Sequence, residues 1–119
     1  MNVIDMLREF HETYGVPVRA TPTADTPEND LRIRLLREEP QEFIDAGDIV
    51  EMAHELADLV YVAYGTALNH GIPLDAVIAE VHRANMSKLD EGGRPVYRED
   101  GKVLKGPNYR PPDIRAILR

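Results

Sequence analysis

The chain has 119 residues, which is enough for one domain with a modest hydrophobic core. It contains no cysteine, which excludes disulfides and thiolate metal sites, and its net charge of −7 argues against broad binding to nucleic acid or anionic membranes. No apolar run reaches transmembrane length, and Asp5, Arg8 and Glu9 interrupt any signal-peptide core. We therefore expect a single cytoplasmic domain over residues 1–119.

The charge is distributed unevenly along the chain. Residues 1–82 hold 16 acidic against 5 basic side chains, a net −11, whereas residues 83–119 hold 5 against 9, a net +4. An acidic part of this kind is suited to divalent cations, and a basic tail is suited to phosphates.

A helix followed by a loop is predicted at the start of the chain. Apolar residues recur at helical spacing over residues 2–14, and Gly15 and Pro17 end that segment. Residues 15–27 contain three prolines and three threonines, a composition typical of an extended loop.

The second predicted helix begins near Thr26, with that threonine as its cap, continues through Ile44 and ends at Gly47. Pro40 lies inside this segment, where a proline removes a backbone donor and clashes with the preceding turn. We expect Pro40 to kink or divide the helix.

The third predicted helix, residues 48–70, is the most apolar segment and is closed by Gly71. Its apolar side chains fall on nearly every side, which predicts a helix buried almost all round. A polar stripe interrupts them at spacings of three and four: Glu51, His54, Glu55 and Asp58. A buried carboxylate needs a partner, a proton or a metal ion.

The rest of the chain predicts one more helix and a small hairpin. The helix begins around residues 73–75 and carries apolar residues up to Met86 before Gly92 and Gly93. The segments 95–98 and 102–105 flank a turn over 99–101. One helical turn is expected from Asp113. The predicted fold is all-α, a four-helix bundle with a small C-terminal β-hairpin appendage.

The second and third helices carry matching pairs of carboxylates. Glu39 and Glu42 share a face of one helix, Glu55 and Asp58 share a face of the next, and the short connection predicts an antiparallel hairpin. Four converging carboxylates without basic partners form an all-oxygen site, which favours Mg²⁺ or Mn²⁺. The neighbouring Glu38 is a candidate general base for a water molecule, or a further ligand.

Plainer interpretations exist for each of these residues. Either carboxylate pair could be part of a solvated helix face. Glu51-x-x-His54 has the spacing of a di-iron carboxylate site, although a second such motif is absent. The remaining histidines have no partners in sequence and are expected at the surface or at helix ends: His11, His70 and His82.

The pattern Glu39-x-x-Glu42 followed by Glu55-x-x-Asp58 resembles the E-x-x-E…E-x-x-D signature of the all-α nucleoside triphosphate pyrophosphohydrolases. The likeness extends over residues 31–114 and is carried by three further segments: HELADLVYVAYG (54–65), AEVHRANMSK (79–88) and DGKVLKGPNYRPPD (100–113). These segments resemble the MazG-like group related to phosphoribosyl-ATP pyrophosphohydrolase.

The resemblance implies roles for individual residues. Glu39, Glu42, Glu55 and Asp58 would bind Mg²⁺, or alternatively Mn²⁺, and Glu38 would activate water. The substrate would be contacted by residues after the third helix: Asn85 and Lys88 at the ribose or phosphates, Lys102 and Lys105 at phosphates, and Tyr109 over the nucleotide.

The implied reaction cleaves a nucleoside triphosphate to the monophosphate and pyrophosphate, with dUTP or another deoxynucleotide as substrate. Family members form homodimers or homotetramers, and the same is expected here. Two alternatives remain: a phosphoribosyl-ATP pyrophosphohydrolase, and a non-catalytic helical dimer that binds nucleotide or metal.

Overall fold

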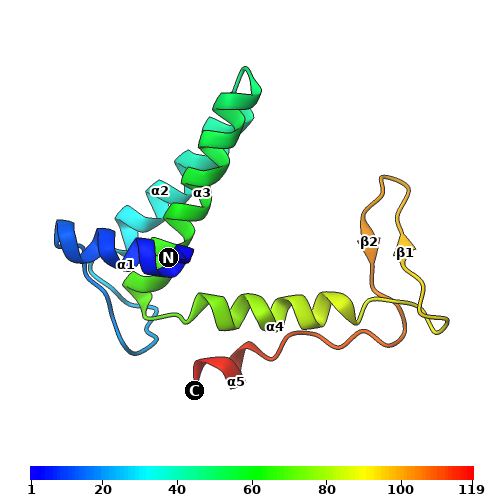
Figure 1. The fold of residues 1–119 in the computed structure, drawn as a ribbon. Helices are drawn as coiled ribbons and strands as arrows, with labels where there is room; N and C mark the ends of the chain where they lie inside the picture. Colours follow the sequence, from blue (N-terminus) through cyan, green and yellow to red (C-terminus); the bar gives the residue numbers. More distant parts are fainter. The chain divides into compact units, whose positions relative to one another are not determined.

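The computed structural model describes residues 1–119, which form two compact units, residues 1–72 and residues 73–119. The first unit contains three helices, and the second contains two helices and a two-stranded hairpin (Figure 1). The elements are α1 (Val3–Tyr14), α2 (Asn29–Ile44), α3 (Ile49–His70), α4 (Leu74–Met86), β1 (Val96–Tyr97), β2 (Val103–Leu104) and α5 (Ile114–Leu118). The predicted all-α class with a C-terminal hairpin is confirmed. No helix has both the length and the apolar character needed to cross a membrane.

Side-chain caps explain where α1 and α3 begin. The Asn2 side chain accepts a hydrogen bond from the Asp5 backbone N–H at 3.0 Å, and Asp48 accepts one from the Glu51 N–H at 2.8 Å. These bonds satisfy donors that the first turn of a helix leaves unpaired. Gly15 ends α1 and Gly71 ends α3, both with left-handed backbones.

The helix α2 differs from its prediction at two points. It begins at Asn29 rather than beside Thr26, because the Thr26 hydroxyl donates to Asn69 Oδ1 at 2.7 Å instead of capping a helix. Pro40 does not divide the helix, which continues to Ile44. A proline removes only its own backbone donor, so the turns on either side can still form.

The helices α2 and α3 lie side by side and are joined by the short turn over residues 45–48 (Figure 1). The prediction that α3 is buried almost all round is wrong. Only Gly65 and the last four residues of α3 are buried, whereas Met52, Leu56 and Val60 are exposed by 38%, 51% and 41%. The first unit has too few elements to cover all sides of a helix of this length.

A polar network ties the loop before α2 to the C-terminal end of α3. Asn69 is completely buried, and its side chain donates to Glu28 at 2.9 Å and accepts from Thr26. Arg19 donates to the Asn69 carbonyl at 2.7 Å and to Glu28 at 3.0 Å. These charge-assisted bonds fix a segment with little regular structure of its own.

Two of the three histidines expected at the surface or at helix ends lie in the last turns of α1 and α3, and both are buried rather than exposed. His70 is 8% exposed, and its ring nitrogens contact the Thr23 carbonyl at 2.8 Å and Asn29 Oδ1 at 3.0 Å. His11 is 2% exposed and packs against Gly65 of α3. Each histidine contacts a segment that is distant in the sequence. Inspection of neighbouring residues in the sequence cannot identify such partners.

In the second unit, the C-terminal tail is fastened to α4. Arg83 pairs with Glu80 at 2.8 Å and donates to the Pro111 carbonyl at 3.0 Å, while Glu80 accepts from the Asp113 N–H at 2.6 Å. Hydrogen bonding from Arg83, followed by the bond from Asp113, lowers the pKa of Glu80 to about 2. The strands β1 and β2 pair antiparallel, with Val96 opposite Leu104 and Tyr97 opposite Val103.

The two helix-ending glycines should respond differently to alanine. Gly15 and Gly71 have nearly equal φ angles of 69° and 68°, but an added Cβ meets nothing at Gly15 and lies 2.4 Å from the Thr21 carbonyl oxygen at Gly71. Gly15→Ala should lower the free energy of unfolding by about 1 kcal/mol through backbone strain. Gly71→Ala should lower it by about 3 kcal/mol, because the 15–28 loop must also move. Urea denaturation measures both, and equal losses would contradict the close loop contact.

Candidate metal centre

The antiparallel pairing of α2 and α3 brings four carboxylates together. Oxygens of Glu39 and Glu42 from α2 and of Glu55 and Asp58 from α3 lie within 4.8 Å of one another. Each pair sits three residues apart on its helix, so both members point toward the same side. These four residues are called the carboxylate cluster below.

The carboxylate cluster has no partner with a permanent positive charge. In residues 1–72, no ion pair joins these four side chains to a lysine or arginine. Glu39 Oε2 and Glu55 Oε2 are buried and accept no hydrogen bond. Buried acceptors of this kind are costly unless a proton or a cation satisfies them.

Two members of the cluster hold their protons more tightly than free glutamates do. Burial, followed by the charge of Glu42, raises the pKa of Glu39. Hydrogen bonding with Glu42, followed by burial, raises the pKa of Glu55. Both shifts indicate that the fully ionised cluster is a high-energy state in the absence of a cation.

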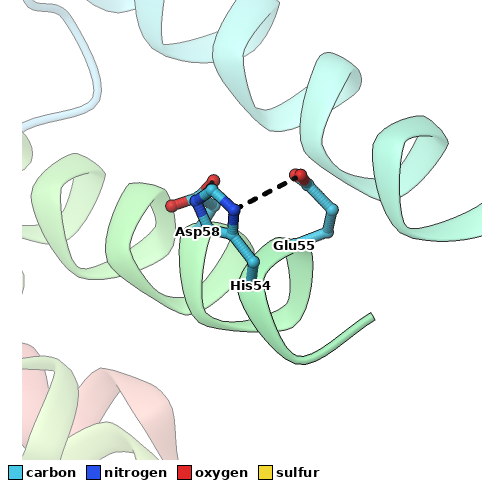
Figure 2. A group of neighbouring side chains, drawn as sticks. All are labelled: His54, Glu55 and Asp58. Carbon is cyan, nitrogen blue, oxygen red and sulfur yellow. Dashed lines mark ion pairs between the residues drawn. The ribbon is translucent and has the colours of Figure 1, made fainter. Parts of the chain in front are cut away.

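His54 lies beside the cluster on α3 (Figure 2). Its Nε2 is 3.2 Å from Asp58 Oδ2, and its Nδ1 is 4.0 Å from Glu55 Oε1. The exposed imidazole can therefore hold the Asp58 carboxylate in place. Glu51 instead accepts from the Gly47 N–H at 2.8 Å and does not join the cluster, so the Glu51-x-x-His54 pair gives no support to a di-iron site.

The cluster fits a hard divalent cation. It offers only carboxylate oxygens, two of them buried without a partner, and such ligands suit Mg²⁺ or Mn²⁺. Glu38, the candidate base, is exposed on α2 and is not among the four oxygens that converge. An exposed carboxylate next to the ligands remains free to meet water.

The residues predicted to contact substrate all lie in the second unit. Asn85 and Lys88 line one hollow of about 400 Å³ together with Met86, Leu89 and Val103. Lys105 Nζ lies 4.9 Å from the centre of the Tyr109 ring, a cation–π distance. Lys102 is exposed in the hairpin, and its backbone N–H donates a hydrogen bond to Asp100 Oδ1 at 3.2 Å. The structure thus groups Asn85 with Lys88 and Lys105 with Tyr109.

Gly106 brings the end of the hairpin close to the end of α4. Its N–H donates to the Lys88 carbonyl at 2.7 Å, and a Cβ at this position would lie 2.2 Å from the Leu89 carbonyl oxygen. Only glycine permits this approach. The contact draws Lys88 and Lys105 to the same part of the unit.

One residue near the metal centre is not suggested by sequence motifs. Arg32 of α2 is 8% exposed and bonds to α3. It lies seven residues before Glu39 and therefore on the same helix face. The seven-residue spacing from Glu39 is the one feature of the sequence that points to Arg32. It is a weak one, because a lone arginine in a charged helix is ordinarily solvated.

The chain is similar to one protein family, one viral protein and one solved structure. The family model of phosphoribosyl-ATP pyrophosphohydrolase matches residues 7–85, which is more than half of the chain and includes the whole carboxylate cluster. An uncharacterized protein of Acanthamoeba polyphaga mimivirus is 28% identical over 105 residues, covering 82% of this chain but only 39% of the viral protein. The crystal structure of a proposed NTP pyrophosphohydrolase from Exiguobacterium sp. 255-15 aligns with a TM-score of 0.49 and 19% identity, over 99% of this chain and 94% of that one.

Removing one charge from the cluster should stabilise the metal-free protein. The raised pKa of Glu55 means that the folded chain binds a proton more tightly than the unfolded chain, so stability falls as pH rises above 4.5. Glu55→Gln should therefore have the higher Tm at pH 7.5 in a chelator, and the difference should vanish as the pH falls below 4.5. Mn²⁺ should raise the Tm of the wild type much more than that of the variant.

Differential scanning calorimetry measures these transitions. Glu12→Gln removes a charge from an exposed position on α1 and serves as the matched control. A metal-free Glu55→Gln protein less stable than the wild type at pH 7.5 would contradict the repulsive cluster.

Proposed function

Because the chain belongs to the phosphoribosyl-ATP pyrophosphohydrolase family, we propose that it is a divalent-metal-dependent pyrophosphohydrolase of nucleoside triphosphates. Its substrate is dUTP or another deoxynucleotide, which water cleaves at the α–β anhydride to the monophosphate and pyrophosphate. One observation carries this proposal: four carboxylates converge without a lysine or arginine partner and leave two buried oxygens unsatisfied.

Different residues of the first unit have different roles in the proposed reaction. Glu39, Glu42, Glu55 and Asp58 would hold Mg²⁺ or Mn²⁺, which would supply positive charge to the phosphate oxygens. Glu38 accepts a proton from the attacking water, a role that suits an exposed carboxylate beside the ligands. His54 keeps the Asp58 carboxylate oriented.

The second unit supplies the contacts to the nucleotide. Asn85 and Lys88 contact the ribose or the phosphates, which is supported by their place in one hollow. Lys102 and Lys105 contact phosphates, and Tyr109 closes over the nucleotide. The cation–π contact of Lys105 with Tyr109 supports a shared place for these two side chains.

Phosphoribosyl-ATP is the second candidate substrate. It is favoured by the family model, whose description names that compound. Both substrates contain the same α–β anhydride next to a nucleoside, so the metal centre serves either one. The choice between them depends on contacts outside the carboxylate cluster.

A panel of dNTPs, NTPs and phosphoribosyl-ATP with Mg²⁺ or Mn²⁺ tests the function by pyrophosphate release. One member should be cleaved far faster than the others, and Glu55→Gln should lower kcat/KM by about a hundredfold or more. Glu38→Gln should lower kcat by about a hundredfold or more while Mn²⁺ binding persists. Glu12→Gln is the control and should retain activity. Binding of Mn²⁺ without release from any member would leave the non-catalytic binding dimer as the function.

We further propose a homodimer or homotetramer. The faces of α1 and α3 form an apolar hollow of about 500 Å³, lined by Val3, Met6, Leu7, Ala53, Leu56, Ala57, Val60 and Tyr61. Three large apolar residues are also exposed around the α2–α3 turn: Ile44, Ile49 and Val50, by 69%, 74% and 75%. Apolar surfaces this extensive are typical of faces covered by another chain.

Sedimentation equilibrium should give a wild-type mass at least twice the chain mass of 13.4 kDa. Leu56→Asp, which buries a charge in the hollow, should shift the mass toward 13.4 kDa. Tyr97→Asp alters an exposed residue of the hairpin and should leave the mass unchanged. A monomeric wild type would contradict the assembly.

A further inference from the structure

Arg32 is a buried cation without a carboxylate partner. Its side chain lies at the α2–α3 contact, where Nε donates to Thr66 Oγ1 at 3.0 Å and Nη2 donates to the Val62 carbonyl at 2.9 Å. Both acceptors are uncharged, and the ion pairs of residues 1–72 do not include Arg32. Burying an unpaired guanidinium costs free energy. We therefore expect this side chain to have a role that offsets the cost.

The surroundings hold the guanidinium in one position. Thr66 Oγ1 donates in turn to the Val62 carbonyl at 2.8 Å, so the two acceptors are themselves linked. A Cβ at Gly65 would lie 2.6 Å from Arg32 Nη2 and 3.1 Å from His11 Nε2, and only glycine leaves this space. Burial, and less strongly the charge of Arg32, lowers the pKa of His11. A neutral His11 can then pack beside the guanidinium.

The position of Arg32 relates directly to the carboxylate cluster. In an antiparallel pair, moving forward along one helix corresponds to moving backward along the other. Seven residues forward from Arg32 lead to Glu39, about 10.5 Å along α2. Seven residues back from Val62 lead to Glu55 on α3. The bonds of Arg32 therefore join the same two helix faces that carry the cluster, two turns away.

We propose that Arg32 is a positioning residue for the metal centre: its guanidinium fixes the register of α2 against α3, and this register brings the four carboxylates close enough to bind one divalent cation. The inference rests on the proposed metal-dependent function. Directional hydrogen bonds can set a register, whereas apolar contacts tolerate sliding. A slip of one residue moves a side chain about 1.5 Å along the axis and about 100° around it, which separates oxygens that now lie within 4.8 Å.

The first test replaces the guanidinium with an apolar chain of similar length. Arg32→Met should weaken Mn²⁺ binding about tenfold in a titration followed by electron paramagnetic resonance. The direction of the change in Mn²⁺ affinity distinguishes a loss of charge from a change of geometry. Loss of a positive charge near four carboxylates would by itself strengthen cation binding, so weaker binding must come from altered geometry. Activity at saturating Mn²⁺ should largely recover, which separates metal affinity from turnover.

Two controls separate positioning from general loss of stability. Arg34→Met removes an exposed arginine from the same helix and should leave Mn²⁺ affinity unchanged. Leu7→Ala creates a cavity at a buried position of α1, and it should lower Tm without weakening Mn²⁺ binding. A Leu7→Ala protein that loses affinity to the same degree as Arg32→Met would overturn the inference.

A second pair of variants acts on the acceptor rather than on the arginine. Thr66→Val keeps the shape of the side chain but removes the acceptor of Arg32 Nε, and it should weaken Mn²⁺ binding several-fold. Thr66→Ser keeps the hydroxyl and should restore wild-type affinity. Wild-type affinity in both Arg32→Met and Thr66→Val would overturn the proposal.

A measurement without metal keeps the inference distinct from the proposed function. The chain contains no cysteine, so Gln41→Cys with Val50→Cys gives two nitroxide labels, one on α2 and one on α3. Arg32→Met should broaden or shift the distance distribution between them, whereas Leu7→Ala should not. If the wild type binds no Mn²⁺, the proposed function fails. The distances between the labels then still test whether Arg32 fixes the register of α2 against α3. Unchanged distances in Arg32→Met would reject that role.

Discussion

Mutual repulsion of carboxylates at the α2–α3 contact is the constraint on which the first unit depends. Four carboxylates converge within 4.8 Å, and two of their buried oxygens lack any donor. Such a contact opposes the packing of the two helices until a cation is bound. Structure elsewhere in the unit must therefore hold α2 against α3. The buried Asn69 network and Arg32 do so at the opposite end from the short turn.

The helix α3 divides along its length into a buried part that supports the fold and an exposed part that carries two residues of the carboxylate cluster. Its last residues are buried and polar atoms among them anchor the loop before α2. Its first half carries Glu55 and Asp58 on one face and exposed apolar side chains on others. A helix that is packed at one end and open at the other can present ligands without having to bury them fully, which limits the desolvation that ionised carboxylates suffer.

The sequence could predict the features that depend on local spacing. Pairs of carboxylates three residues apart and a short connection between two helical segments are sufficient to predict the α2–α3 hairpin and the convergence of Glu39, Glu42, Glu55 and Asp58. It could not predict the burial of His11, His70 or Arg32. The partners of these side chains lie on other elements, up to 47 residues away for His70 and Thr23. Whether a polar side chain is buried depends on tertiary contacts. The local sequence pattern alone would assign such residues to the surface.

Family membership and substrate choice rest on different parts of this chain. The family match covers residues 7–85 and therefore contains every member of the carboxylate cluster, but it ends before Lys88, Lys102, Lys105 and Tyr109. Cleavage of a phosphoric anhydride depends mainly on positioned charge around the phosphates, which the proposed metal centre would supply. Discrimination between nucleotides instead needs groups that meet the base and sugar. Asn85 lies inside the match, whereas the other residues proposed to contact the nucleotide lie beyond it, so membership of the family bears on the proposed metal centre more directly than on the choice of nucleotide.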